Sequence, residues 1–142
     1  MNNPDSALLL FEQAKDLATQ AIQKENRPKI KKALLQLHLS TAYNNIGFIH
    51  SIKGEILIAL ENYLKSMYIR KKIKNKELLS SSLINIGYVY YSLGDLPKAL
   101  NFFIDALHTK EQLKDTNGII TAQNNIAHIY AIQKDYRKAL LR

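Results

Sequence analysis

The sequence predicts an all-α fold in which antiparallel helix hairpins stack in a row, as in an α–α superhelix. Two observations predict it. The 142 residues include only three prolines and five glycines, fewer turn residues than a chain of many short strands requires. The string NNIGFIH at 44–50 also returns as NIGYVY at 85–90 and as NNIAHIY at 124–130, at an interval of forty residues. A unit of that length cannot bury its own apolar face, so copies of it must stack on one another.

The first predicted element is a helix over residues 4–24. Its sequence PDSALLLFEQAK resembles PKALNFFIDALH later in the chain, and the comparison places Ala7 opposite Ala99 and Ala14 opposite Ala106. Since the later segment is the second helix of a repeated unit, we expect the chain to open on the second helix of an incomplete unit.

Two units follow, over residues 28–76 and 77–116, and each is predicted to contain two helices. In the first helix of each unit, the first running from near Pro28 to about Ile52, small or apolar residues recur at helical spacing. They are Ala42, Ile46, Ile49 and then Ser82, Ile86, Val89. Gly54 and Gly94 occupy the place where this helix should end, because glycine tolerates the left-handed conformation found after a helix C-terminus.

The second helix of each unit is predicted to begin at an acidic residue, Glu55 or Asp95, where a negative charge suits the positive end of the helix dipole. Pro97 fits the first turn of a helix, where its missing N–H costs little. Two apolar stripes follow, Ala59, Tyr63, Met67 and Ala99, Phe103, Leu107. Opposite the alanines, Gly47 and Gly87 should let the two helices approach closely.

Residues 117–142 are predicted to form a partial unit, in which KDYRKALLR supplies about two turns of another second helix. No polar capping helix closes the predicted array, although the end repeats of soluble solenoids usually need one. We therefore expect the chain to be a piece of a larger protein or to cover its ends by self-association.

The repeated unit resembles the tetratricopeptide repeat (TPR) family, in its forty-residue variety. The segment NIGYVYYSLGDLPKALNFFIDAL carries the resemblance, through Gly87, Tyr90, Gly94, Leu96, Ala99, Phe103 and Ala106. The pattern departs from the family at Lys71 and Glu111, where many repeats end in proline, and at His50, which replaces an aromatic residue. The resemblance implies a solenoid with a concave groove that binds a peptide or protein segment.

The candidate groove residues are the ones that helical register places beside the interhelical seam. They are Asn44, Asn45, Phe48, Asn85, Tyr88, Tyr91, Asn124, Asn125 and His128. An amide offers both a donor and an acceptor, so it can hold the backbone of an extended peptide whatever its sequence. The same asparagines could instead hydrogen-bond a neighbouring helix, since a buried amide must be paired either way. Because no Lys or Arg flanks them, they do not favour a C-terminal carboxylate as ligand.

Composition and motifs argue against an enzyme and against a membrane-spanning protein. The four histidines show no metal-ligand spacing, no glycine-rich phosphate loop occurs, and cysteine is absent. We predict no enzyme activity and no cofactor. No apolar run reaches the roughly 20 residues of a membrane span, and no signal peptide is recognisable, so the expected location is the cytoplasm.

The formal net charge of +8 raises nucleic acid as an alternative partner. The basic residues over 65–76 are interpreted as a solvated helix end, with no aromatic platform beside them. They are Lys65, Arg70, Lys71, Lys72, Lys74 and Lys76.

The predicted function is a non-catalytic scaffold that binds a protein or peptide. The forty-residue repeats look like those of bacterial sensor and regulator proteins, which implies an interaction module of a larger regulatory protein. A self-association module, a homo-oligomer held by its exposed terminal helices, is the second alternative.

Overall fold

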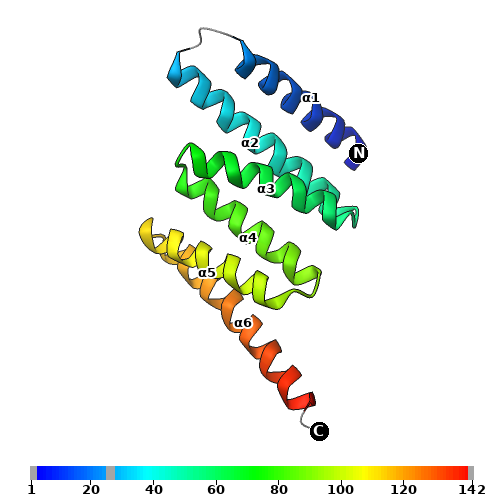
Figure 1. Ribbon diagram of the computed structural model, residues 1–142, viewed down its shortest axis with the longest axis vertical. Coiled ribbons are helices and arrows are strands. Elements are labelled where there is room, and N and C mark those ends of the chain that lie inside the picture. Colours follow the sequence, from blue (N-terminus) through cyan, green and yellow to red (C-terminus); the bar gives the residue numbers. More distant parts are fainter. Residues whose placement is uncertain (1–2, 25–27, 141–142) are drawn as a thin grey trace. The chain divides into compact units, whose positions relative to one another are not determined.

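A computed structural model describes residues 3–24 and 28–140 of the chain, which form six α-helices and no strand. The chain divides into two compact units, Met1–Asn75 and Lys76–Arg142. Residues 1–2 and 141–142, the outermost positions of the predicted repeat array, lie outside the described residues. The helices are α1 (Pro4–Gln23), α2 (Lys29–Ile52), α3 (Ile56–Lys72), α4 (Lys76–Ser92), α5 (Leu96–Gln112) and α6 (Thr116–Leu140) (Figure 1).

In the first unit α2 packs against both α1 and α3. The predicted stripe of α2 is buried, with Ile46 only 1% exposed, and Ala59 and Tyr63 of α3 are buried as well. A methyl group added at Gly47 would lie 2.9 Å from Cδ1 of Tyr63 and 3.2 Å from the carbonyl oxygen of Ala59. The close approach predicted from the small residues is therefore confirmed.

In the second unit α4 and α5 form the same kind of hairpin, and α6 packs against α5. Phe103 lies at the centre, 2% exposed, in a cluster with Ala99 and Ile129. A methyl group added at Gly87 would lie 2.6 Å from Cε1 of Phe103, and the ring of Tyr88 meets Phe103 edge-on at 5.2 Å between centroids. One aromatic side chain thus fills the space that the missing glycine side chain leaves open.

The turns within the hairpins follow the predicted chemistry. Gly54 and Gly94 both have φ of 79°, in the left-handed region. Glu55 and Asp95 then occupy the N-cap positions of the next helices. The carboxylate of Asp95 accepts a hydrogen bond from the backbone N–H of Lys98 at 3.2 Å, whereas the side chain of Glu55 makes no capping hydrogen bond. These predictions are confirmed.

Replacing Gly94 by alanine should lower the free energy of unfolding by about 1 kcal/mol, because a Cβ is strained at positive φ. Steric clash makes no contribution, since an added Cβ would have no atom within 4 Å. Gly94→Asn should lose less, because asparagine tolerates this conformation. Urea unfolding of both variants tests the explanation, and equal losses for alanine and asparagine would contradict it.

The turns after α3 and α5 are made differently. Lys74 and Lys114, forty residues apart, adopt the left-handed conformation with φ of 59° and 55°. Their backbone N–H groups donate to the carbonyl oxygens of Lys71 and Glu111 at 3.2 and 3.0 Å. These turns could not be predicted, because lysine has no preference for positive φ.

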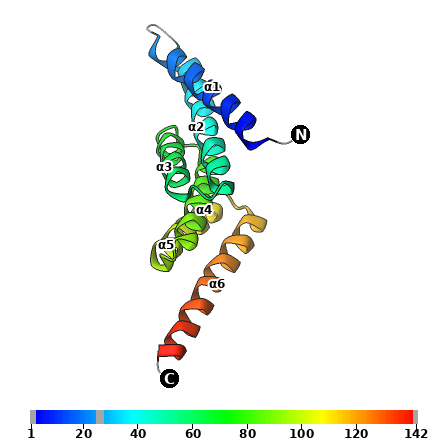
Figure 2. The same ribbon diagram turned by 90° about the vertical axis from the view of Figure 1, so that its right-hand side faces the viewer.

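The predicted turn near Lys134, with a new helix from Asp135, was wrong. α6 continues without a break from Thr116 to Leu140, as Figure 2 shows. Lys134 lies forty residues after Gly94, and lysine would pay about 1–2 kcal/mol for the left-handed conformation that glycine adopts there. Lys134, Asp135 and Leu140 are exposed, so these side chains provide no packing that would compensate for a turn.

Arg70 and Lys110, which lie forty residues apart at equivalent positions of the two repeats, are both buried. Arg70 is 3% exposed and its Nε donates to Oγ of Ser40 at 3.3 Å, so its inclusion in a solvated basic cluster was wrong. Lys110 is 8% exposed, and its Nζ lies 3.0 Å from Oδ2 of Asp115. The backbone N–H of Gly118, which donates to Oδ1 of Asp115, and the nearby Lys110 together lower the pKa of that carboxyl group.

The neighbourhood of the remaining basic residues also differs from the prediction. Lys72 lies 5.9 Å from the ring centroid of Tyr68, which is 65% exposed, so an aromatic side chain does accompany this surface. Lys65 is paired with Glu61 at 3.1 Å and lies over the ring of Tyr43. None of the described helices is long and apolar enough to cross a membrane.

Candidate functional site

Four of the predicted site residues meet in the second unit, where one face of α4 lies beside α6. The hydroxyl of Tyr88 donates to Oδ1 of Asn125 at 3.1 Å. Tyr91 approaches His128, with 3.4 Å between the hydroxyl oxygen and Nε2 and 5.9 Å between the ring centroids. Both tyrosines stay partly open to solvent, at 47% and 38% exposed. The helical register that predicted these residues therefore places them on one surface.

Asn125 is half-buried, and the two ends of its amide differ. Oδ1 is satisfied by Tyr88, which confirms the alternative of interhelical hydrogen bonding for this oxygen. Nδ2 is shielded from solvent and has no hydrogen-bond partner in the part of the chain that the structure describes. An unmade hydrogen bond at a shielded donor costs about 1–3 kcal/mol, so an acceptor that reached it would be favoured.

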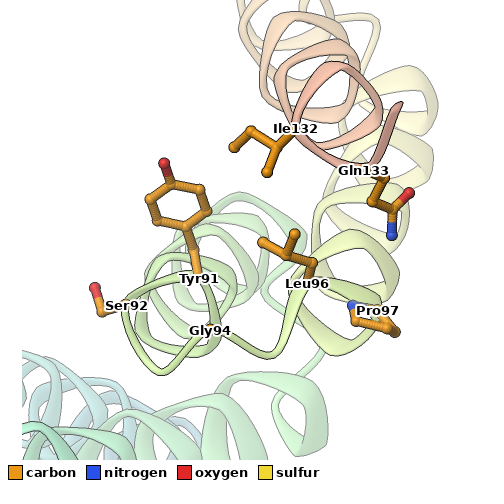
Figure 3. A pocket seen from close by; sticks show the side chains of 7 residues that line it. All are labelled: Tyr91, Ser92, Gly94, Leu96, Pro97, Ile132 and Gln133. Atoms are coloured by element: carbon orange, nitrogen blue, oxygen red, sulfur yellow. The ribbon is translucent and has the colours of Figure 1, made fainter. Parts of the chain in front are cut away.

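A pocket of about 590 Å³ adjoins Tyr91, between the α4–α5 turn and α6. Figure 3 shows Tyr91, Leu96 and Ile132 pointing toward its centre, with Ser92 and Gln133 at its edges. The lining joins apolar side chains to amide and hydroxyl groups, a combination suited to a peptide. Apart from Tyr91 these residues were not predicted, because Leu96 belongs to the start of α5 and Ile132 to a segment expected to end its helix.

In the first unit a second pocket, of about 620 Å³, lies between α1 and α2. Of the predicted site residues only Asn45 lines it, next to Thr41 on α2, and half of the lining residues are apolar side chains of α1. Phe48 is 54% exposed on α2, and Asn44 is half-buried. The α1 side of this pocket was missed because α1 was considered only as part of an incomplete repeat.

Asn85 is half-buried in α4 and Asn124 is exposed on α6. Neither belongs to the pair of contacts made by Tyr88 and Tyr91. No group of three or more histidine, cysteine, aspartate or glutamate side chains among the described residues could hold a metal ion.

The sequence profile of the tetratricopeptide repeat family matches residues 38–112, just over half of the chain. The chain belongs to the tetratricopeptide repeat family. The match spans both helix hairpins, α2–α3 and α4–α5, whose glycine seams and left-handed turns are described above. This TPR chain is therefore a protein-interaction scaffold in general character.

Among solved structures, the TPR chain is similar to the crystal structure of BtubC (BKLC) from P. vanneervenii. The TM-score is 0.71 at 15% sequence identity, over 98% of this chain and 54% of that one. The chain thus spans about half the length of that protein, and the likeness confirms the all-α superhelical fold class. No curated protein matches the sequence significantly.

Proposed function

We propose that the TPR chain binds an extended protein segment along the surface formed by Tyr88, Tyr91, Asn125 and His128, without catalysing a reaction. Binding of a protein or peptide is the general role that the family match supports. The specific surface is our inference from the contacts between α4 and α6.

The observation that carries this proposal is the unpartnered Nδ2 of Asn125. A backbone carbonyl of a bound segment would accept its hydrogen bond, after a small rotation of the half-exposed Tyr88 ring. The segment's side chains could then enter the pocket beside Tyr91, where Leu96 and Ile132 supply apolar area. Tyrosine adds contact area at a low entropic cost, because only two torsion angles become fixed.

Replacing Asn125 by alanine should weaken binding of peptides selected on the wild-type chain from a random displayed library. The lost amide bond to a backbone is worth about 1 kcal/mol, so binding should weaken about fivefold. Fluorescence titration of the selected peptides measures the effect.

The matched control is Asn101→Ala, which removes an exposed amide from α5 outside the site. It should bind selected peptides as the wild type does. Thermal melts must show that Asn125→Ala stays folded. An Asn125→Ala variant that binds normally would contradict the proposal, and one that loses its fold would assign this amide to structure.

We also propose that the chain is the sensory or interaction module of a larger bacterial regulatory protein. This rests on the forty-residue repeats alone, which resemble those found beside signalling and DNA-binding domains. The complete reading frame tests it, since an adjoining kinase or DNA-binding domain is expected.

Nucleic-acid binding remains the alternative function. The burial of Arg70 and the pairing of Lys65 with Glu61 weaken it, because they leave fewer positive charges to contact phosphates.

A further inference from the structure

α6 exposes the face that the first helix of each hairpin buries. Ser80, Leu83 and Gly87 of α4 are buried, and Tyr90 of the same stripe is half-buried with its ring stacked on Phe102 at 5.5 Å. The residues forty positions later on α6 are all exposed, with Ile120 at 51% and Tyr130 at 53%. This exposed stripe consists of Ile120, Gln123, Ala127 and Tyr130.

α1 exposes the complementary face. The alignment of Ala7 with Ala99 places Leu10, Ala14 and Leu17 opposite Phe102, Ala106 and Thr109 of α5. Ala106 and Thr109 are buried and Phe102 is half-buried in the hairpin. In α1, by contrast, Leu10 and Leu17 are 64% and 67% exposed, and Ala14 is exposed as well. α1 thus has the register of a second helix, and none of the described helices covers this face.

The pocket between α1 and α2 lies where a first helix would pack against α1, as α4 packs against α5. Ala14, Leu17 and Asn45 line it. The corresponding pair in the second unit is α5 with α6, since Asn125 lies eighty residues after Asn45. There the equivalent place is filled by α4, which packs on α5 and reaches Asn125 through Tyr88. The structure therefore contains its own template for a helix seated on α1 and α2.

We propose that α6 of one copy docks into the groove between α1 and α2 of a second copy, so that α6 and α1 complete a hairpin. The template sets the contacts: Tyr130 would pack on Leu10 as Tyr90 packs on Phe102, and Ala127 would face Phe11 as Gly87 faces Phe103. The methyl group of Ala127 holds Phe11 further out than Phe103 lies from Gly87, which a helix of a separate molecule can accommodate.

The charges of the two helices favour this occupant. Among the six described helices α1 is the one with an acidic excess, from Asp5, Glu12 and Asp16 against Lys15. α6 is basic toward its C-terminal end, which carries Lys134 and Arg137. In the antiparallel arrangement of the template, Asp5 at the start of α1, whose Oδ1 pairs with Nζ of Lys53 at 3.1 Å, would lie at the Lys134 end of α6. The complementary charges direct the two ends of different copies toward each other.

The contact is heterologous, because one copy supplies α6 and the other supplies the groove. Each bound copy still offers a free α6 or a free groove, so assembly continues beyond a dimer unless the rotation closes a ring. Asn45 lines this groove and lies outside the proposed peptide surface, and self-association is measured without a peptide, so the two proposals are tested separately.

Sedimentation equilibrium over a wide range of protein concentration tests the proposal. The wild-type weight-average mass should rise with concentration past that of a dimer. Ala14→Arg blocks the groove and Ala127→Arg blocks α6, and each alone should associate at least about tenfold more weakly. Both side chains are exposed, so the variants should keep the wild-type circular dichroism. Ala33→Arg, an exposed position of α2 outside both faces, should associate normally.

Sedimentation equilibrium of a mixture of the two blocked variants is the decisive measurement. The intact α6 of Ala14→Arg should dock into the intact groove of Ala127→Arg, and assembly should stop at a one-to-one pair. A wild-type chain that stays monomeric at every concentration would overturn the proposal and leave these faces to a different partner. Variants that associate like the wild type, or a mixture that forms no pair, would overturn it equally.

Discussion

Replacing Phe103 by alanine lowers the free energy of unfolding by about 3–5 kcal/mol, the range for truncating a buried phenylalanine. The ring is 2% exposed and contacts two other helices: Gly87 and Tyr88 of α4, and Ile129 of α6, which belongs to the same core cluster. Because helices α4, α5 and α6 all pack around Phe103, its truncation leaves a cavity that the surrounding helices cannot fill without moving apart from their other contacts. Urea unfolding followed by circular dichroism measures the change.

Phe102→Ala is the matched control, since it removes the same side chain one residue earlier on the same helix. Phe102 is half-buried and stacks on Tyr90 at the surface, so the loss should be about 1 kcal/mol. Similar losses for the two variants would show that Phe103 is not the centre of the unit.

Gly87→Leu should cost about 3 kcal/mol, through overpacking rather than through a cavity. The first carbon of the new side chain would already lie 2.6 Å from Cε1 of Phe103, closer than side-chain carbons approach other atoms. Gly87→Ala should lose less, since alanine gains up to about 1 kcal/mol of helix propensity that offsets part of the clash. Thermal and urea unfolding of both variants test this.

Ala127→Leu changes the equivalent position of α6, forty residues later, where the side chain is exposed. At a concentration at which the chain is monomeric, its free energy of unfolding should stay within about 0.5 kcal/mol of the wild type.

A second test combines Phe103→Leu with Gly87→Leu. The smaller side chain at position 103 should restore part of the free energy of unfolding that Gly87→Leu loses. Additive losses in that double variant would contradict a direct clash between the two positions.

Much of the fold could be predicted because its determinants repeat. Gly54 and Gly94 mark the same turn twice, and Ile46 and Ile86 mark the same buried face, so each observation supports the other. The error at Lys134 has the same origin: the repeat was extended to a position where glycine is replaced and no neighbouring helix makes a turn favourable. Local sequence sets the propensity for a turn, but the packing around it decides whether it forms.

The candidate site was predictable where it depended on helical register, as for Tyr88 and Asn125, which share one face. It was not predictable where it depended on which helices pack together. Leu96 and Ile132 are far apart in the sequence and share the pocket beside Tyr91 only because α6 packs against α5. The burial of Arg70 was missed for the same reason, since its partner Ser40 lies on another helix.

The left-handed lysines at Lys74 and Lys114 have an electrostatic consequence. Both side chains are exposed, and each is fixed to the same place in its repeat by a turn that every further copy of the motif would reproduce. Part of the +8 charge therefore recurs at an interval of forty residues along the sequence. Lengthening such an array would add one ammonium group per repeat, so its mutual repulsion with other cationic molecules would grow with its length.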